Sequence, residues 1–155
     1  MILLFGFLSC SSPTDSDKHD TLYVKFTNES TSAYTITNIQ LQAMGKAGDS
    51  VATPSGVWSA NILTDGKTIA PGAHEFFTLD IPNLHWSQYR LGVSDGSGGE
   101  IMLHEQEGYE NEIIFNPSIT HWGSDERTVS VTIVSNPSTG VIYISGYSDF
   151  AGIDD

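Results

Sequence analysis

Apolar and polar residues alternate through most of the chain from residue 21 onward, and this feature most constrains the fold. Leu22, Val24 and Phe26 alternate with more polar neighbours, and residues 128–134 repeat the pattern. A period of two is typical of a β-strand that buries one face and exposes the other. No stretch keeps the spacing of an amphipathic helix, so an all-β chain is predicted, with the polar residues of 128–134 facing solvent.

Nine short segments are predicted to be strands. They are residues 21–27, 34–43, 57–63, 75–81, 88–94, 100–106, 111–115, 128–134 and 140–145. In the second segment Tyr34 and Ile36 point to one face, whereas Ile39 and Leu41 have the opposite parity. One extra residue in a strand reverses the face of all residues that follow, so a β-bulge is expected at residues 37–38.

Turn-forming residues separate these segments. Residues 64–67 contain the Asp-Gly pair of tight turns, and residues 70–73 contain the Pro-Gly pair of a type II turn. The glycine-rich residues 95–99 are expected to form a hairpin loop, and the Asn-Pro pairs at residues 116–117 and 136–137 are expected to end two strands. Many short strands punctuated in this way predict an antiparallel β-sandwich, Ig-like or a related Greek key, with about eight or nine strands. A small β-barrel is the alternative.

Length and charge limit the domain count and the partners. The chain has 155 residues, which suits one folded domain, and a formal net charge of −13. Six Lys and Arg residues against 19 Asp and Glu residues give the wrong balance for binding a phosphate backbone, so no nucleic acid is expected as a partner. The single cysteine, Cys10, cannot form a disulfide within the chain or a CxxC pair.

The first ten residues, MILLFGFLSC, form an apolar run that ends in a small residue and this cysteine. The run is too short to span a bilayer, which takes about 20 apolar residues, but it is long enough for the apolar region of a signal peptide. Residues 7–10 read Phe-Leu-Ser-Cys and resemble the lipobox of bacterial lipoproteins, in a relaxed form found in Bacteroidota. The resemblance implies cleavage before Cys10 and a diacylglycerol on its thiol. The alternative is a first core strand with an ordinary buried cysteine.

The residues after Cys10 fit the same interpretation. Residues 11–20 are polar or charged apart from one proline, so they are expected to form a flexible tether. The predicted organisation is a signal peptide at residues 1–9, a lipidated cysteine and tether at 10–20, one β-sandwich domain at 21–148 and a frayed acidic tail at 149–155. It implies a cell-envelope protein, held in the outer membrane by its lipid anchor and facing the periplasm or the cell surface.

The middle of the domain also resembles small bacterial extracytoplasmic β-domains. Trp58, Asn61 and Leu63 follow a Trp-x-x-Asn-x-Leu pattern, after which come Ala-Pro-Gly at residues 70–72 and a Tyr-x-Leu-x-Val strand at residues 89–93. These motifs are structural, so the resemblance implies a fold and no chemistry. Because Trp58 lies inside a predicted strand, it is expected in the core.

Two His-Trp pairs are the candidate ligand-binding residues. They are His85 with Trp86 and His121 with Trp122. Both pairs are predicted to lie in loops, where an indole can stack against a sugar ring and a histidine can hydrogen bond to its hydroxyls. The alternative is that each tryptophan closes one end of the sandwich.

No catalytic residue, metal ligand or cofactor is predicted. The chain contains no Gly-x-Ser-x-Gly elbow, and its five histidines lack the spacing of paired metal ligands. The acidic residues 105–112 and the 95–100 loop lack a calcium-binding ladder and are expected to be solvated. The preferred hypothesis is a non-catalytic, lipid-anchored binding or adhesion module whose ligand is a glycan or a protein. The second is an extracytoplasmic hydrolase or metal-dependent protein whose dispersed histidines and carboxylates meet in the fold.

Overall fold

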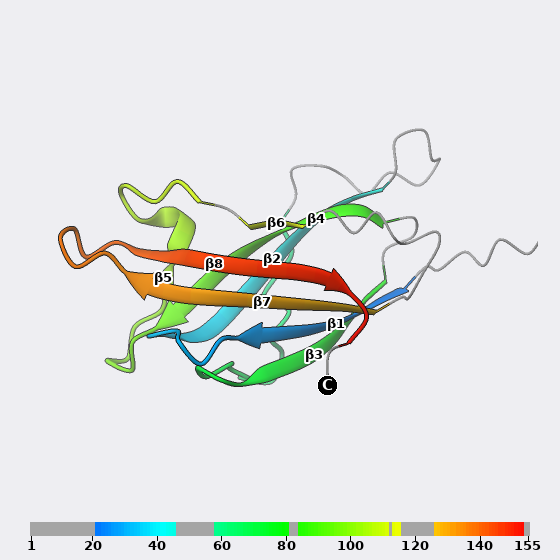
Figure 1. The fold of residues 1–155 in the computed structure, drawn as a ribbon, viewed down its shortest axis with the longest axis horizontal. Coiled ribbons are helices and arrows are strands. Elements are labelled where there is room, and N and C mark those ends of the chain that lie inside the picture. The colour runs from blue at the N-terminus through cyan, green and yellow to red at the C-terminus, as the bar shows by residue number, and fades with distance from the viewer. Residues whose placement is uncertain (1–20, 46–57, 81–83, 112, 116–125, 154–155) are drawn as a thin grey trace, which may run out of the picture.

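The computed structural model describes residues 21–45, 58–80, 84–111, 113–115 and 126–153, which form two β-sheets packed face to face (Figure 1). Eight of the nine predicted strands have a counterpart in the structure. The described strands stay in two separate sheets, so the sandwich is confirmed over the small barrel. Within the described ranges, no helix has the length and apolar character needed to cross a bilayer.

The sheets divide the strands four and four. The strands are β1 (Thr21–Asn28), β2 (Thr35–Gly45), β3 (His74–Asp80), β4 (Leu84–Ser94), β5 (Ile101–Met102), β6 (Ile113–Phe115), β7 (Glu126–Ser135) and β8 (Ile142–Ala151), and a short 3-10 helix, η1 (Leu103–Glu105), follows β5. The first sheet has the order β3-β1-β7-β8. In the second sheet, β4 pairs with β2 on one side and with β5 and β6 on the other.

One strand pair departs from the antiparallel arrangement that the sequence predicts. β1 and β7 run parallel, whereas the other pairs are antiparallel. The parallel pair arises because the chain crosses from β6 in the second sheet to β7 in the first, and β7 enters the first sheet beside β1. β7 is therefore an inner strand with neighbours on both sides.

The core lies between the two sheets. Phe26 of β1 and Tyr89 of β4 meet edge to face across the gap, with ring centroids 5.5 Å apart. Burial of apolar surface contributes about 25 cal/mol per Å², so these inner faces are the main source of stability. The buried apolar residues are Val24, Phe26, Ile36, Ile39, Leu41, Leu63, Ile69, Tyr89, Leu91, Val93, Leu103, Val129, Val131, Ile133, Ile142 and Ile144. The predicted inner faces of β1 and β7 are thereby confirmed for their described side chains, which do not include that of Leu22.

The β-bulge in β2 is also confirmed. The register between β2 and β4 shifts between Ile36 and Asn38, so Ile36, Ile39 and Leu41 all reach the core. Gly92 pairs with Asn38 opposite the bulge, and a Cβ at Gly92 would lie only 2.7 Å from the Cβ of Asn38. Close packing at the bulge therefore requires a glycine on β4.

The two predicted turns have the expected geometry. Asp65 and Gly66 both have positive φ, at 59° and 71°, as a tight Asp-Gly turn requires. In the Pro-Gly turn, Gly72 has a φ of 82°, and the amide of Ala73 donates to Ala70 O at 2.9 Å. Local sequence therefore determines both turns.

The prediction of a strand at residues 57–63 is wrong for residues 58–63, the part that the structure describes. This segment lies along the outer edge of β2, where side chains replace part of the backbone ladder. Asn61 Oδ1 accepts from Ile39 N at 3.0 Å, and Ser59 Oγ accepts from Leu41 N at 2.9 Å. The segment covers the edge of the second sheet without forming a strand, and a covered edge cannot pair with another chain.

Trp58 lies outside the core, contrary to the sequence expectation. The indole is half-buried, and the guanidinium carbon of Arg90 lies 3.9 Å from the ring centroid. Arg90 alternates with the buried Tyr89 and Leu91 on β4, so this cation-π contact lies on the outer face of the second sheet. The strand parity that predicted burial does not apply, because residues 58–63 are not a strand.

Two expectations for the last strands are corrected. Thr128 and Ser130 are buried rather than solvent-facing, because β7 is an inner strand and Thr128 Oγ1 donates to Gly152 O at 3.0 Å. β8 continues to Ala151, so the predicted tail boundary at residue 149 is too early. Asp149 is held in the fold by an ion pair with Arg127.

Candidate functional site

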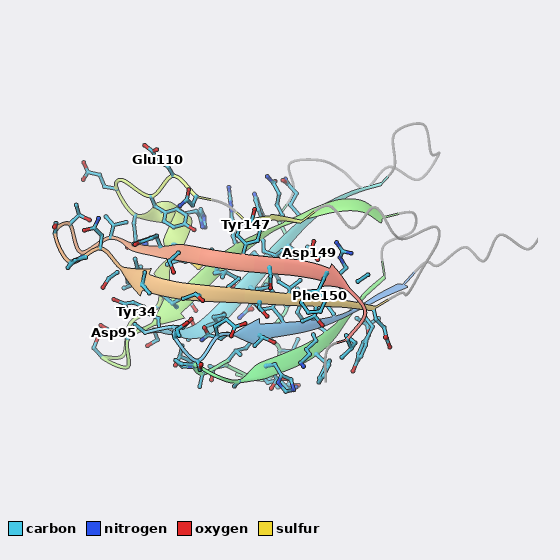
Figure 2. All side chains as sticks on the ribbon, in the orientation of Figure 1. Tyr34, Asp95, Glu110, Tyr147, Asp149 and Phe150 are labelled. Carbon is cyan, nitrogen blue, oxygen red and sulfur yellow. The ribbon has the colours of Figure 1, made fainter. Side chains whose placement is uncertain are left out.

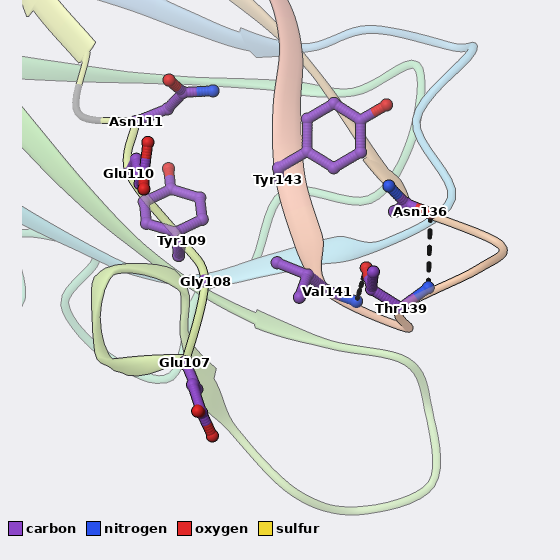
Figure 3. Close-up of a pocket in the computed structure, with 9 residues that line it drawn as sticks. All are labelled: Glu107, Gly108, Tyr109, Glu110, Asn111, Asn136, Thr139, Val141 and Tyr143. Carbon is purple, nitrogen blue, oxygen red and sulfur yellow. Dashed lines mark hydrogen bonds between the residues drawn. The ribbon is translucent and has the colours of Figure 1, made fainter.

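A cleft of about 690 Å³ lies at the end of the sandwich that carries the β7–β8 hairpin (Figure 3). Its two walls are residues 107–111, which follow η1, and residues 136–143, which include the hairpin loop. In Figure 1 this end lies opposite the start of β1. The side chains that line the cleft are Glu107, Tyr109, Glu110, Asn111, Asn136, Thr139, Val141 and Tyr143.

Gln106 fixes the first wall. Its side-chain amide donates to Ile142 O at 3.0 Å and accepts from Ile142 N at 3.1 Å, as a neighbouring strand would do at the edge of β8. The same Nε2 also donates to the backbone oxygen of Leu103, whose side chain is 1% exposed in the core. Residues 107–111 therefore start from a point that is bonded both to η1 and to β8.

Asn136 shapes the second wall. Its Oδ1 accepts from the amides of Ser138 and Thr139, at 2.8 and 3.3 Å, and its backbone oxygen accepts from Gly140 N at 2.8 Å. Gly140 has a φ of 74°, which favours glycine. Because the turn uses Oδ1, Nδ2 is the group that Asn136 presents as a donor, and Figure 3 shows the amide nitrogen on the side of Tyr143.

Two tyrosines give the cleft its aromatic surfaces. Tyr109 packs partly against the core. Tyr143 lies between the buried Ile142 and Ile144 on β8, so its side chain points to the opposite face of the strand. Figure 3 shows the two rings on the two walls, and both residues are half-buried, so part of each ring is open to a ligand.

The charge of the cleft is negative. Its lining contains two carboxylates and no Lys or Arg. Both carboxylates, of Glu107 and Glu110, are on exposed residues. Figure 2 shows Glu110 and Asp95 toward the same end of the molecule. An anion that approaches this end meets like charges, whereas neutral and cationic ligands do not.

None of the sequence-predicted ligand residues is among the described residues that line the cleft. His85 and Trp86 lie within β4, where Trp86 pairs with Met44 of β2, so their predicted loop location is wrong. Pro82 suggested a loop, but the strand begins as early as Leu84. His121, Trp122 and Cys10 lie outside the described residues.

The cleft itself was not predicted. Its walls are separated by more than 20 residues of sequence, and their approach depends on the bonds between Gln106 and Ile142. The available signal was the mixture of Glu, Tyr and Asn in residues 107–111. The sequence interpretation treated this run only as a solvated acidic loop, because no local pattern marks its neighbour in space.

The acidic loops show no metal-binding arrangement in the part of the chain that the structure describes. No three His, Cys, Asp or Glu side chains gather there closely enough to hold a metal ion. Asp95 Oδ1 accepts from Ser97 N at 2.7 Å, and hydrogen bonds with Ser97 lower the pKa of the Asp95 carboxyl. Glu100 accepts from Thr37 Oγ1 at 2.8 Å beside the bulge of β2. Both carboxylates therefore have structural partners.

A buried ion pair lies away from the cleft. Arg127 Nη2 is 2.7 Å from Asp149 Oδ2, and Arg127 is 8% exposed. Burial raises the pKa of the Asp149 carboxyl, although the hydrogen bond and the charge of Arg127 act in the opposite direction. Asp149 Oδ1 and Arg127 Nε have no partner among the described residues. Figure 2 shows Asp149 far from Glu110, so the pair is not part of the cleft.

Comparisons with known proteins find weak structural matches to toxins. No family model matches the chain, and no curated protein is significantly similar to it. Suilysin, a cytotoxin from Streptococcus suis, is 12% identical over 88% of this chain and 24% of its own, with a TM-score of 0.38. The human-specific toxin intermedilysin is 10% identical over 82% of this chain and 23% of its own, with a TM-score of 0.37.

A third structure, described as a trapped toxin, is 13% identical over 84% of this chain and 23% of its own, with a TM-score of 0.37. This chain thus spans about a quarter of the length of these toxins. At TM-scores this low, the similarity carries no functional assignment.

Proposed function

We propose that this chain is a non-catalytic binding module of the cell envelope, anchored by lipid at Cys10, that holds its ligand in the cleft between residues 107–111 and 136–143. The observation that carries the binding role is the cleft itself. Its volume of about 690 Å³ falls within the range of about 300–1,000 Å³ that is usual for ligand sites. Its walls are fixed by the bonds of Gln106 and Asn136, which is the preorganisation that binding favours.

The position of the cleft supports the proposed anchor. Ten residues separate Cys10 from Thr21, and they can span at most about 35 Å when extended. β1 begins at Thr21, at the end of the sandwich opposite the cleft (Figure 1). A lipid on Cys10 would therefore attach the domain through the end of the sandwich opposite the cleft, so the attachment point itself would not cover the cleft. The proposal assigns the chain to the outer membrane, facing the periplasm or the cell surface.

The chemistry of the lining supports binding rather than catalysis. Glu107 and Glu110 are exposed. The amide, hydroxyl and tyrosine groups around them are suited to reversible hydrogen bonds and ring contacts.

Membrane fractionation in a Bacteroidota host tests the anchor. The wild-type chain and a Ser11→Ala control are expected in the membrane fraction, because both keep Cys10. The Cys10→Ala chain is expected in the soluble fraction. If Cys10→Ala remains with the membrane as fully as the wild type does, lipidation at this residue is refuted.

A further inference from the structure

The two walls of the cleft offer both donors and acceptors of hydrogen bonds. On the hairpin wall, the turn uses Asn136 Oδ1, which leaves the Nδ2 amide as a donor. Thr139 Oγ1 accepts from Val141 N at 3.3 Å, so its own proton is directed elsewhere and can be donated. On the loop wall, the carboxylates of Glu107 and Glu110 only accept when they are ionised, whereas the amide of Asn111 can both donate and accept. A ligand that spans the cleft therefore meets donors on the hairpin wall and both donors and acceptors on the loop wall.

This requirement selects among ligand chemistries. A hydroxyl group both donates and accepts, whereas an ammonium group only donates and a carboxylate or sulfate only accepts. An apolar ligand would leave the amide and the carboxylates without partners, which costs free energy when water is excluded. The groups that best satisfy both walls are therefore hydroxyls.

The aromatic rings and the charge narrow the choice further. Tyr109 and Tyr143 place aromatic rings on the two walls and are partly exposed, and such rings are suited to the flat apolar faces of sugar rings. With two carboxylates and no cation in the lining, an acidic sugar would be repelled. We propose that the cleft binds an uncharged oligosaccharide, with a sugar ring against Tyr143 and its hydroxyls between Asn136 and the carboxylate of Glu110. This inference rests on the proposed binding role of the cleft.

Calorimetric titration of the full-length chain in mild detergent tests the ligand class. The probes are neutral hexasaccharides (cellohexaose, maltohexaose and xylohexaose), an acidic galacturonate hexamer and a cationic glucosamine hexamer. At least one neutral probe is expected to bind, with the acidic probe at least tenfold weaker. The inference is overturned if none of the neutral probes binds, or if the acidic or cationic hexamer binds more tightly than all of them.

Variants on one strand locate the site. Tyr143→Ala is expected to weaken binding of the neutral probe about tenfold, a change that corresponds to about 1.4 kcal/mol. Tyr147→Ala is the matched control, because Tyr147 lies on the same strand, is 58% exposed and does not line the cleft. It is expected to bind as the wild type does. Equal losses of binding affinity in Tyr143→Ala and Tyr147→Ala would overturn the placement of the sugar.

A second pair of variants does not depend on a half-buried tyrosine. Glu107 and Glu110 are exposed, so Glu107→Gln with Glu110→Gln is expected to fold normally. The double variant should reduce the ratio between the affinities for the neutral and the acidic hexamer by about threefold or more. An unchanged gap would contradict the role of the two carboxylates.

The outcomes separate this inference from the proposed function. If Cys10→Ala stays with the membrane while a neutral hexasaccharide binds in the cleft, the anchor fails and the sugar site stands. If the wild type is anchored through Cys10 but no neutral saccharide binds, the sugar site fails and the anchor stands.

Discussion

Replacing Asn61 with alanine tests whether one side chain holds residues 58–63 against the edge of the second sheet. Asn61 Oδ1 accepts from Ile39 N and Leu63 N, each at 3.0 Å, and Nδ2 donates to Thr37 O at 3.0 Å. Ile39 and Leu63 are buried in the core. The substitution would remove three bonds and leave two amides and one carbonyl to find other partners.

The expected loss of stability follows from these bonds. Each is worth about 1 kcal/mol net, so Asn61→Ala should lower the free energy of unfolding by about 3 kcal/mol. This is a large share of the roughly 5–15 kcal/mol that stabilises an ordinary domain. In urea titrations followed by tryptophan fluorescence, the midpoint should fall by about 1.5 M for a slope of about 2 kcal/mol/M.

Two variants make the test specific. Asn61→Asp keeps the acceptor for the two amides but loses the donor to Thr37 O, so its loss should be smaller, at about 1–2 kcal/mol. Asn111→Ala, at an exposed position, should change stability by less than about 0.5 kcal/mol. If the urea midpoint of Asn61→Ala falls no further than that of Asn111→Ala, water replaces these bonds and the proposed role of Asn61 is refuted.

Three other predictions concern close packing and the buried ion pair. Gly92→Ala should cost about 1–3 kcal/mol in urea titrations, since its Cβ would press on Asn38 and Met102; an unchanged midpoint would refute the close contact. Arg127→Met or Asp149→Leu alone should lower the free energy of unfolding by about 3–5 kcal/mol, because each leaves a buried charge without its partner. The double variant should be at least as stable as the wild type, and additive losses of stability would contradict this. Burial raises the Asp149 pKa above 3.8, so the folded state binds its proton more tightly, and the stability of the wild type relative to Asp149→Asn should fall as pH rises through and above 3.8. If this difference in stability stays constant or increases as pH rises, the Asp149 pKa is not raised in the folded state.

The fold was largely predictable because strand parity and turn chemistry are local. The opposite parities of Ile36 and Ile39 predicted the bulge, and the residues at 70–73 predicted their turn before any tertiary contact was known. Parity failed at residues 58–63, where Asn61 and Ser59 satisfy the edge of β2 with side chains. No sequence period distinguishes such a segment from a strand.

The cleft was less predictable because it depends on contacts between distant residues. Tyr109 belongs to the loop after η1 and Tyr143 to β8, and the side-chain amide of Gln106 joins the two by bonding to the backbone of Ile142 as a neighbouring strand would. A glutamine in an acidic run gives no sign of such a partner. The candidate His-Trp pairs rested on loop signals, and β4 begins before His85.

The most direct test of a sugar-binding cleft is to map backbone amide shifts by NMR while the neutral hexasaccharides are titrated into the isotope-labelled full-length chain. Shifts that saturate with a neutral hexasaccharide should concentrate in residues 107–111 and 136–143, and Tyr143→Ala should weaken them. Tyr23 of β1 and Phe76 of β3 form an exposed, stacked aromatic pair on the first sheet. Saturating shifts confined to this pair and its neighbours, or no shifts with any neutral hexasaccharide, would contradict the proposed site.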